Sequence, residues 1–269
     1  MSKIRLDICL VNKNIVPSRS KASELIHNGK VMVNGKVIVK PSFEVLESDN
    51  ISLLENELLK FVSRGGLKLE KALNYFNINI KDFIILDIGA STGGFTDCAL
   101  KHNAKKVYSL DVGTDQLHES LKNDSRVISL ENTNFKDVNH EMIKDKIDLY
   151  VCDVSFISIT TILKILKNFD DKFTIIILYK PQFEVGKNNL NANGVVKNKK
   201  VLLQSLNNFK MFLDSLNVGI IDGTYSPITG QKEGNVEFLF YLKSNEKSNS
   251  INFEKIIDEA YNVLKVKKC

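Results

Sequence analysis

Three aspartates stand where apolar, strand-like runs end. Asp87 lies in FIILDI, Asp111 follows VYSL and Asp153 follows LYVC. The carboxyl ends of parallel strands meet at one edge of a sheet, and such folds bind their ligands there. A single acid at a strand end is often only a turn former, but three of them in one domain indicate a site. Acids gathered at this edge favour a cationic ligand over a phosphate.

A glycine-rich turn follows the first acid, in LDIGASTGGFTD, residues 86–97. Its glycines allow a ligand to approach the backbone closely. The string lacks both the G-x-G-x-x-G register of a dinucleotide site and the G-K-[ST] of a phosphate loop. It resembles the D/E-x-G-x-x-x-G turn of S-adenosylmethionine-dependent methyltransferases. By that resemblance we expect Asp87 near the cationic methionine end and Asp111 on the ribose hydroxyls. The predicted cofactor contacts are Asp87, Gly89, Ala90, Ser91, Gly93, Gly94, Phe95, Asp111, Val112 and Asp153.

Two lysines and a fourth acid extend this set. Lys180 ends the strand-like run FTIIILY, and Lys68 follows the Arg-Gly-Gly turn in VSRGGLKL. Glu237 interrupts the apolar run GNVEFLFYL, which predicts that the acid has a specific role. A lysine at a strand end can simply extend its ammonium group into water. If burial or a second cation lowers its pKa from about 10.4, its neutral amine can instead take a proton from a hydroxyl group.

Strand-like and helical runs alternate from residue 64 onward, which predicts an α/β fold. The sheet should be mostly parallel and covered by helices on both faces. The loop 226–235 is too short for a parallel crossover, so the seventh strand should be antiparallel. This is the layout of a class I (Rossmann-like) methyltransferase. The predicted strands are 83–88, 106–111, 126–130, 147–153, 173–179, 218–225 and 235–242, and the predicted helices are 66–78, 94–103, 115–122, 139–145, 159–168, 198–216 and 252–266.

The first 60 residues are predicted to form a separate, basic α+β unit. Helices are expected at 3–12 and 18–28, followed by a hairpin around Asn34-Gly35 and a further strand in DNISLLE. Residues 1–40 carry eight Lys or Arg against two acids. This excess indicates a polyanionic partner, although a lysine-rich solvated face is the alternative. We predict domains at 1–60 and 61–269, with a short connector at 57–64.

Taken together, the motifs resemble the hemolysin A/TlyA family. VSRGGLKLEKAL, LDIGASTGGFTDCALKHNAKKVYSLDVG, DVSFISIT, KPQFE and GNVEFL carry the resemblance. Lys68, Asp153, Lys180 and Glu237 match the K-D-K-E tetrad of FtsJ-like 2′-O-ribose RNA methyltransferases in order and context. PSRSKASELIHNGKVMVNGK resembles the S4-type RNA-binding domain.

This resemblance implies S-adenosylmethionine-dependent 2′-O-methylation of cytidines in ribosomal RNA. Lys180 would accept the proton and Asp153 would orient it, while Lys68 and Glu237 would tune charge and hold the ribose. Phe156 would lie either near the substrate or in the core. The implied RNA contacts are Arg5, Arg19, Ser20, Lys21, Lys30, Asn34, Lys36 and Arg64.

Composition limits the other classes of protein. The four cysteines are scattered, so we expect neither a disulfide framework nor a metal site. No apolar run reaches the roughly 18 residues of a membrane span, and we predict a cytoplasmic protein without an obligate protein partner. Its partners would be ribosomal RNA or ribosomal subunits. Two alternatives are a membrane-lytic hemolysin, which the family's older name suggests, and an RNA-binding ribosome factor whose methyltransferase fold is inactive.

Overall fold

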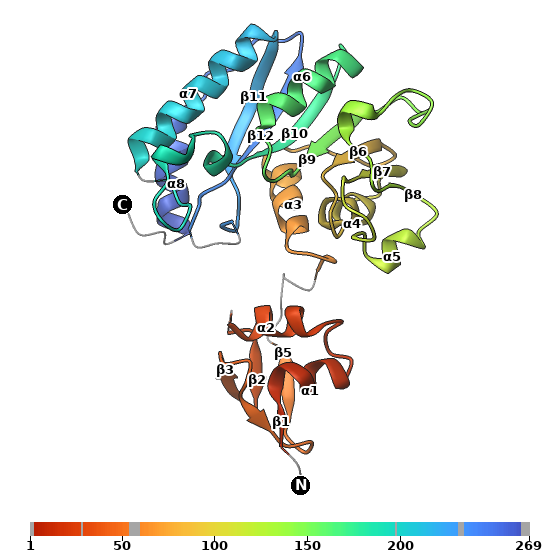
Figure 1. Ribbon diagram of the computed structural model, residues 1–269, viewed down its shortest axis with the longest axis vertical. Helices are drawn as coiled ribbons and strands as arrows, with labels where there is room; N and C mark the ends of the chain where they lie inside the picture. Colours follow the sequence, from red (N-terminus) through yellow and green to blue (C-terminus); the bar gives the residue numbers. More distant parts are fainter. Residues whose placement is uncertain (1–2, 28, 54–59, 197, 231–233, 265–269) are drawn as a thin grey trace. The chain divides into compact units, whose positions relative to one another are not determined.

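The chain divides into two compact units, Met1–Lys60 and Phe61–Cys269 (Figure 1). The computed structural model describes residues 3–27, 29–53, 60–196, 198–230 and 234–264. Of the predicted connector at 57–64, residues 57–59 lie outside these ranges. No helix in the described ranges is both long enough and apolar enough to cross a membrane.

The larger unit is built on a seven-stranded sheet in the order β11-β12-β10-β9-β6-β7-β8. Strand β12 is antiparallel to both of its neighbours, and the other pairs are parallel. The predicted class I methyltransferase layout is confirmed, including its antiparallel last strand. The strands are β6 Ile84–Ile88, β7 Lys106–Leu110, β8 Val127–Leu130, β9 Leu149–Cys152, β10 Thr174–Tyr179, β11 Val218–Tyr225 and β12 Phe238–Ser244.

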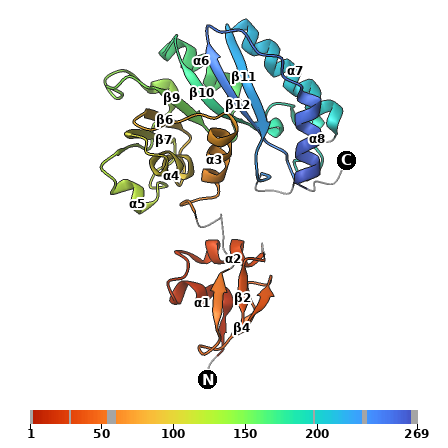
Figure 2. The ribbon, with the colours of Figure 1, turned by 180° about the vertical axis from the view of Figure 1, so that it is seen from behind.

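Helices cover both faces of this sheet. On one face, α6, α7 and α8 bury apolar side chains such as Leu166, Leu206 and Ile257 against the strands. Figure 2 shows α7 and α8 side by side. On the other face, α3 packs on β12 and α4 packs on β6 and β7. The helices are α3 Gly65–Tyr75, α4 Gly94–Lys101, α5 Glu119–Lys122, α6 Ile159–Phe169, α7 Lys199–Ser215 and α8 Phe253–Val263, with short 3₁₀ turns η2 Phe135–Asp137, η3 Pro181–Phe183 and η4 Lys187–Asn189.

Three predicted elements of the larger unit differ from the structure. The helix predicted at 115–122 is confined to Glu119–Lys122. The helix predicted at 139–145 is wrong, because the Asn139 side chain accepts hydrogen bonds from the amides of Glu141 and Met142 and closes a turn there. Asparagine side chains compete with helix formation in this way. The last strand begins at Phe238, so Glu237 stands immediately before it rather than inside it.

The smaller unit contains two helices and two small sheets. β3, β2 and β5 form a three-stranded sheet, and β1 pairs with β4. Asn34 and Gly35, with φ of 50° and 78°, make the predicted hairpin turn between β2 and β3. The first predicted helix begins later than expected, because Ile4–Arg5 forms a strand. The elements are β1 Ile4–Arg5, α1 Leu6–Asn12, α2 Arg19–His27, β2 Val31–Val33, β3 Lys36–Ile38, β4 Glu44–Val45 and β5 Ile51–Leu53.

Candidate active site

Two lysines and two acids from distant parts of the larger unit meet at one edge of the sheet. Asp153 follows β9, and Lys180 follows β10. Because β12 is antiparallel to β10, its first residue pairs with the last of β10, which brings Glu237 to the same edge. Lys68 projects from α3, which lies against β12.

The four groups form a continuous chain of ion pairs. Lys180 Nζ lies 2.6 Å from Asp153 Oδ1, and Lys68 Nζ lies 3.3 Å from Asp153 Oδ2. Lys68 Nζ also lies 2.9 Å from Glu237 Oε2. Lys68, Lys180 and Glu237 are all buried, and Glu237 is only 2% exposed. The two positive and two negative charges therefore balance inside the protein.

Lys68 and Asp153 hold their charges in this arrangement. Burial lowers the pKa of Lys68, but Asp153 and Glu237 outweigh burial and raise that pKa above its usual value. Burial raises the pKa of Asp153, but the two lysines outweigh it and keep the pKa below its usual value. Lys68 is thus an ammonium group and Asp153 a carboxylate at neutral pH.

Ser155 and Phe156, shortly after Asp153, make contacts that the spacing of apolar residues in the sequence does not reveal. The Ser155 hydroxyl accepts a hydrogen bond of 2.8 Å from Lys180 Nζ. Phe156 is 92% exposed and has φ of 65°, a backbone conformation that bulky residues rarely adopt. Its ring lies 5.4 Å from that of Phe183, between ring centroids. The core role considered for Phe156 is wrong, because the ring faces solvent.

The glycine turn packs its backbone closely against this edge. Gly89 and Gly93 have φ of 85° and 91°, which favours glycine. A Cβ atom at Gly89 would lie 2.9 Å from the Val154 side chain and 3.2 Å from the Asp153 carbonyl oxygen. Of the other predicted contacts in the turn, Ala90, Gly94 and Phe95 are buried and Ser91 is exposed.

Asp87 is fully buried under the turn. Its Oδ2 accepts a hydrogen bond of 2.7 Å from the Thr96 hydroxyl of α4, while its Oδ1 has no hydrogen-bond partner among the described residues. Burial, opposed by the Thr96 hydrogen bond and reinforced by the charge of Asp153, raises the pKa of Asp87 to about 7. A carboxylate oxygen that is buried without a hydrogen-bond partner in the described part of the chain fits a nearby cation. Its complete burial leaves its charge, rather than direct contact, as its means of acting on a ligand.

Asp111 lies on the surface of the same edge, one residue beyond β7. Its Oδ2 accepts from the Ser91 amide at 2.8 Å and its Oδ1 from the Gly113 amide at 2.7 Å. These bonds tie the loop after β7 to the glycine turn. Val112 is 67% exposed beside it. A carboxylate oxygen has more than one lone pair, so both oxygens can still accept hydroxyl groups.

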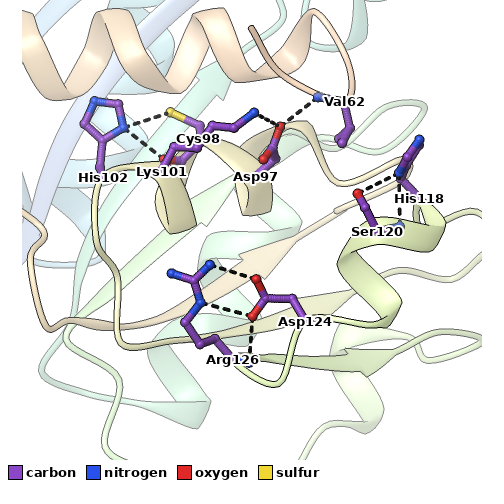
Figure 3. Close-up of polar contacts among 9 residues, drawn as sticks. All are labelled: Val62, Asp97, Cys98, Lys101, His102, His118, Ser120, Asp124 and Arg126. Atoms are coloured by element: carbon purple, nitrogen blue, oxygen red, sulfur yellow. Dashed lines mark hydrogen bonds and ion pairs between the residues drawn. The ribbon is translucent and has the colours of Figure 1, made fainter. Parts of the chain in front are cut away.

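The segment that enters α3 is fixed against α4 next to the glycine turn. The Val62 amide donates a 2.8 Å hydrogen bond to Asp97 Oδ2, which also pairs with Lys101 (Figure 3). A Cβ atom at Gly94 would lie 2.9 Å from the Gly66 amide nitrogen, so the two helices approach closely there. The segment from residue 61 is therefore held against the helix that follows the glycine turn.

The residues predicted to contact RNA have varied surroundings. In the smaller unit, Arg5 and Arg19 both bind Asp7, and Lys21 pairs with Glu24 at 3.3 Å. Both ends of the Asn34 side-chain amide are bonded within the unit, to Asp49 and Asn50. Ser20 and Lys36 are exposed, and Lys30 and, in the larger unit, Arg64 are half-buried.

Comparison with known families assigns the fold of both units. The model of the FtsJ-like methyltransferases matches residues 61–244, and the model of the S4 domain matches residues 4–51. The chain belongs to the FtsJ-like methyltransferase family. The tetrad and the glycine turn both lie within the matched range.

Similar proteins extend along nearly the whole of this FtsJ-like methyltransferase. Hemolysin A of Brachyspira hyodysenteriae is 44% identical over 241 residues, which cover 89% of this chain and 99% of that protein. The 16S/23S rRNA (cytidine-2′-O)-methyltransferase TlyA of Mycobacterium tuberculosis is 38% identical, over 90% of each chain. A solved structure from Streptococcus thermophilus that carries the hemolysin name is 35% identical, with a TM-score of 0.77 over 98% of each chain.

Proposed function

We propose that this methyltransferase transfers the methyl group of S-adenosylmethionine to the ribose 2′-hydroxyl of cytidines in ribosomal RNA. The observation that carries the proposal is the buried set of two amines and two acids at the carboxyl edge of the sheet. A ribose hydroxyl is a poor nucleophile, so it needs both a base and close placement on an electrophile. The relatives in M. tuberculosis and Campylobacter jejuni are named for this reaction.

The cofactor, S-adenosylmethionine, supplies an activated methyl group on a sulfonium cation. We assign its ribose hydroxyls to Asp111, whose oxygens can accept them beyond the two amides that they already bind. The rest of the molecule would lie along the turn that contains Gly89 and Gly93, flanked by the neighbouring residues of the turn and by Val112. The buried charge of Asp87 would favour the cation from beneath the turn.

Lys180 is the proposed proton acceptor. Lys68 lies between two acids, which keep it charged. Lys180 instead faces one carboxylate, which it shares with Lys68, and one neutral hydroxyl group, that of Ser155. Of the two amines, Lys180 therefore has fewer acids around it, and we assign to it the role of taking the proton from the 2′-hydroxyl. Asp153 would orient Lys180, and Lys68 with Glu237 would hold the ribose and balance the charge.

Phe156 is the proposed platform for the target base. Phe156 stands three residues after Asp153, and it is exposed on a backbone whose positive φ is rare for a bulky residue. Aromatic side chains that bind nucleic acids stack on bases in this way. The Phe183 ring supports it from one side.

Residues 1–60 are the proposed RNA-binding domain and residues 61–269 the catalytic domain. Ribosomal subunits in the cytoplasm would be the substrate. Basic side chains on the RNA-binding domain would contact phosphates and so fix position rather than read sequence. The contacts proposed are Arg5, Arg19, Ser20, Lys21, Lys30, Asn34 and Lys36, with Arg64 from the catalytic domain.

Replacement of the proposed base tests the mechanism. Lys180→Ala should abolish transfer of labelled methyl groups to ribosomal subunits but retain S-adenosylmethionine binding in a calorimetric titration. Lys144→Ala, an exposed lysine of the same unit, is the matched control and should retain both. Methyl transfer by Lys180→Ala at the control's rate would remove Lys180 as the base.

A second experiment tests the reaction itself. Mapping of 2′-O-methylation in ribosomal RNA from cells with and without this protein should reveal a cytidine that loses its methyl group. If S-adenosylmethionine binds but no ribose methylation depends on the protein, the inactive RNA-binding factor becomes the better description.

A further inference from the structure

One buried carboxylate of the smaller unit holds two arginines together. Asp7, in the first turn of α1, is only 3% exposed. Arg5 binds it with two parallel hydrogen bonds of 2.9 Å, from Nε to Oδ1 and from Nη2 to Oδ2. Arg19 Nη2 adds a bond of 3.2 Å to Oδ2. The carboxylate is thus shared by two guanidinium groups.

The two arginines come from different elements. Arg5 ends β1 and Arg19 begins α2, so only the fold brings them to one carboxylate. Their side chains are 47% and 60% exposed, respectively, while the Asp7 side chain is 4% exposed. A guanidinium group carries five N–H donors, and Asp7 occupies two of Arg5 and one of Arg19. Both groups therefore present further donors to solvent from fixed orientations.

Stability alone gives a weak reason for this arrangement. Ion pairs that involve well-exposed arginines typically contribute little to folding, and burial of a carboxylate opposes it. The hydrogen bond from Arg5 is the largest of the effects that hold the pKa of Asp7 at about 2, so the carboxylate is charged throughout the neutral range. An acid on a basic surface also repels a polyanion. Its net effect on RNA affinity therefore depends on what it does to the arginines.

We propose that Asp7 is a positioning residue for RNA binding, which fixes Arg5 and Arg19 as one preformed clamp for the phosphate backbone. This inference rests on the proposed function. Arginine side chains lose conformational freedom when they bind, and groups already fixed by Asp7 lose less of it. Two guanidinium groups held at one carboxylate can bind the same or adjacent phosphate groups. Unrestrained side chains would have to adopt that arrangement separately when they bind.

A positioning role and electrostatics alone imply opposite effects of Asp7→Asn on RNA affinity. The substitution removes one negative charge from a basic surface, so electrostatics alone predicts tighter RNA binding. Asparagine retains an oxygen that can accept the hydrogen bond from the Ile8 amide in the first turn of α1. It cannot bind both guanidinium groups as a carboxylate does, so the positioning role predicts weaker binding.

The test uses the full-length protein and a fluorescein-labelled ribosomal RNA hairpin. Asp7→Asn should raise the Kd on the order of tenfold and reduce the salt dependence of binding by about one phosphate contact. With ribosomal subunits it should raise KM and leave kcat unchanged. Glu47→Gln makes the same charge change at an exposed acid of the same unit and should leave the Kd unchanged or slightly lower it.

A second comparison separates positioning from damage to the fold. When Arg5→Gln and Arg19→Gln are already present, Asp7→Asn should weaken RNA binding no further, because the groups it positions are gone. A further loss in that background, or binding by Asp7→Asn as tight as that of Glu47→Gln, would overturn the positioning role and leave the methyltransferase assignment standing. Failure of the unmodified protein to bind or methylate RNA would overturn both.

Discussion

The buried carboxylate of Asp87 should make the enzyme less stable than it could be. Burial, despite the hydrogen bond from Thr96, raises its pKa from 3.8 to about 7. The folded state therefore takes up a proton between these values that the unfolded state does not bind, and stability falls as pH rises through this range. The pKa shift is about three units, and each unit corresponds to about 1.36 kcal/mol. Above pH 7 the buried charge therefore lowers the free energy of unfolding by roughly 4 kcal/mol.

Asp87→Asn removes this charge while nearly preserving shape. The new amide oxygen can still accept the Thr96 hydroxyl bond, but the amide nitrogen replaces an oxygen that has no hydrogen-bond partner among the described residues. A buried donor without a partner costs about 1–3 kcal/mol. We therefore expect the variant to be more stable by about 1–3 kcal/mol near pH 8. Near pH 5 the advantage should be smaller by roughly 3 kcal/mol, because Asp87 is then protonated in the folded state.

Urea unfolding followed by circular dichroism, at both pH values and constant ionic strength, measures these differences. Asp82→Asn is the control, since it makes the same charge change at an exposed position where φ is 64°, and asparagine tolerates that conformation. Asp87→Asn should also bind S-adenosylmethionine more weakly in a calorimetric titration, since a negative charge near the cofactor is lost. An Asp87→Asn protein that is destabilised equally at both pH values would refute the argument from burial.

Three further substitutions have defined outcomes. Phe156→Ala should raise KM for ribosomal subunits about tenfold, since stacking on a base contributes about 1–3 kcal/mol, without changing cofactor affinity or thermal stability; an unchanged KM would contradict the platform role. Gly93 has φ of 91° and contacts a leucine side chain, so Gly93→Ala should lower the free energy of unfolding by about 2 kcal/mol. Gly194 has φ of 75° but lies in open space, so Gly194→Ala should lower it by less. Equal losses in a urea titration would show that crowding at Gly93 is irrelevant. Lys68→Met should lose about 3 kcal/mol because it leaves Glu237 buried with one partner fewer, and Glu237→Gln in that background should recover part of the loss; no recovery would argue against the ion pair.

The sheet could be predicted because its strands and turns are determined by short stretches of sequence. Apolar runs, loop lengths and turn residues determine where strands end, and parallel topology then brings Asp153 and Lys180 to one edge. The short loop after β11 was sufficient to predict the direction of β12. That direction explains why Glu237, far along the chain, reaches the same edge.

The features that the sequence missed depend on contacts between distant segments. The two-residue strands β1 and β4 are too short to show a period. Nothing in the spacing of Arg5 and Arg19 indicates a shared carboxylate, and nothing in KFVS indicates that the Val62 amide binds Asp97. At residues 139–145 a side chain of Asn139 overrode the helical pattern.

The position of β12 has a consequence for how the enzyme is made. This strand comes last along the chain but lies between β10 and β11, so ribosomal synthesis releases both flanking strands before the one that separates them. Until β12 inserts, the edge of β10 is open and Lys68 has only one acid beside it. We therefore expect a nascent chain that ends before Glu237 to be inert, with a gap in its sheet that a chaperone or a second chain could enter.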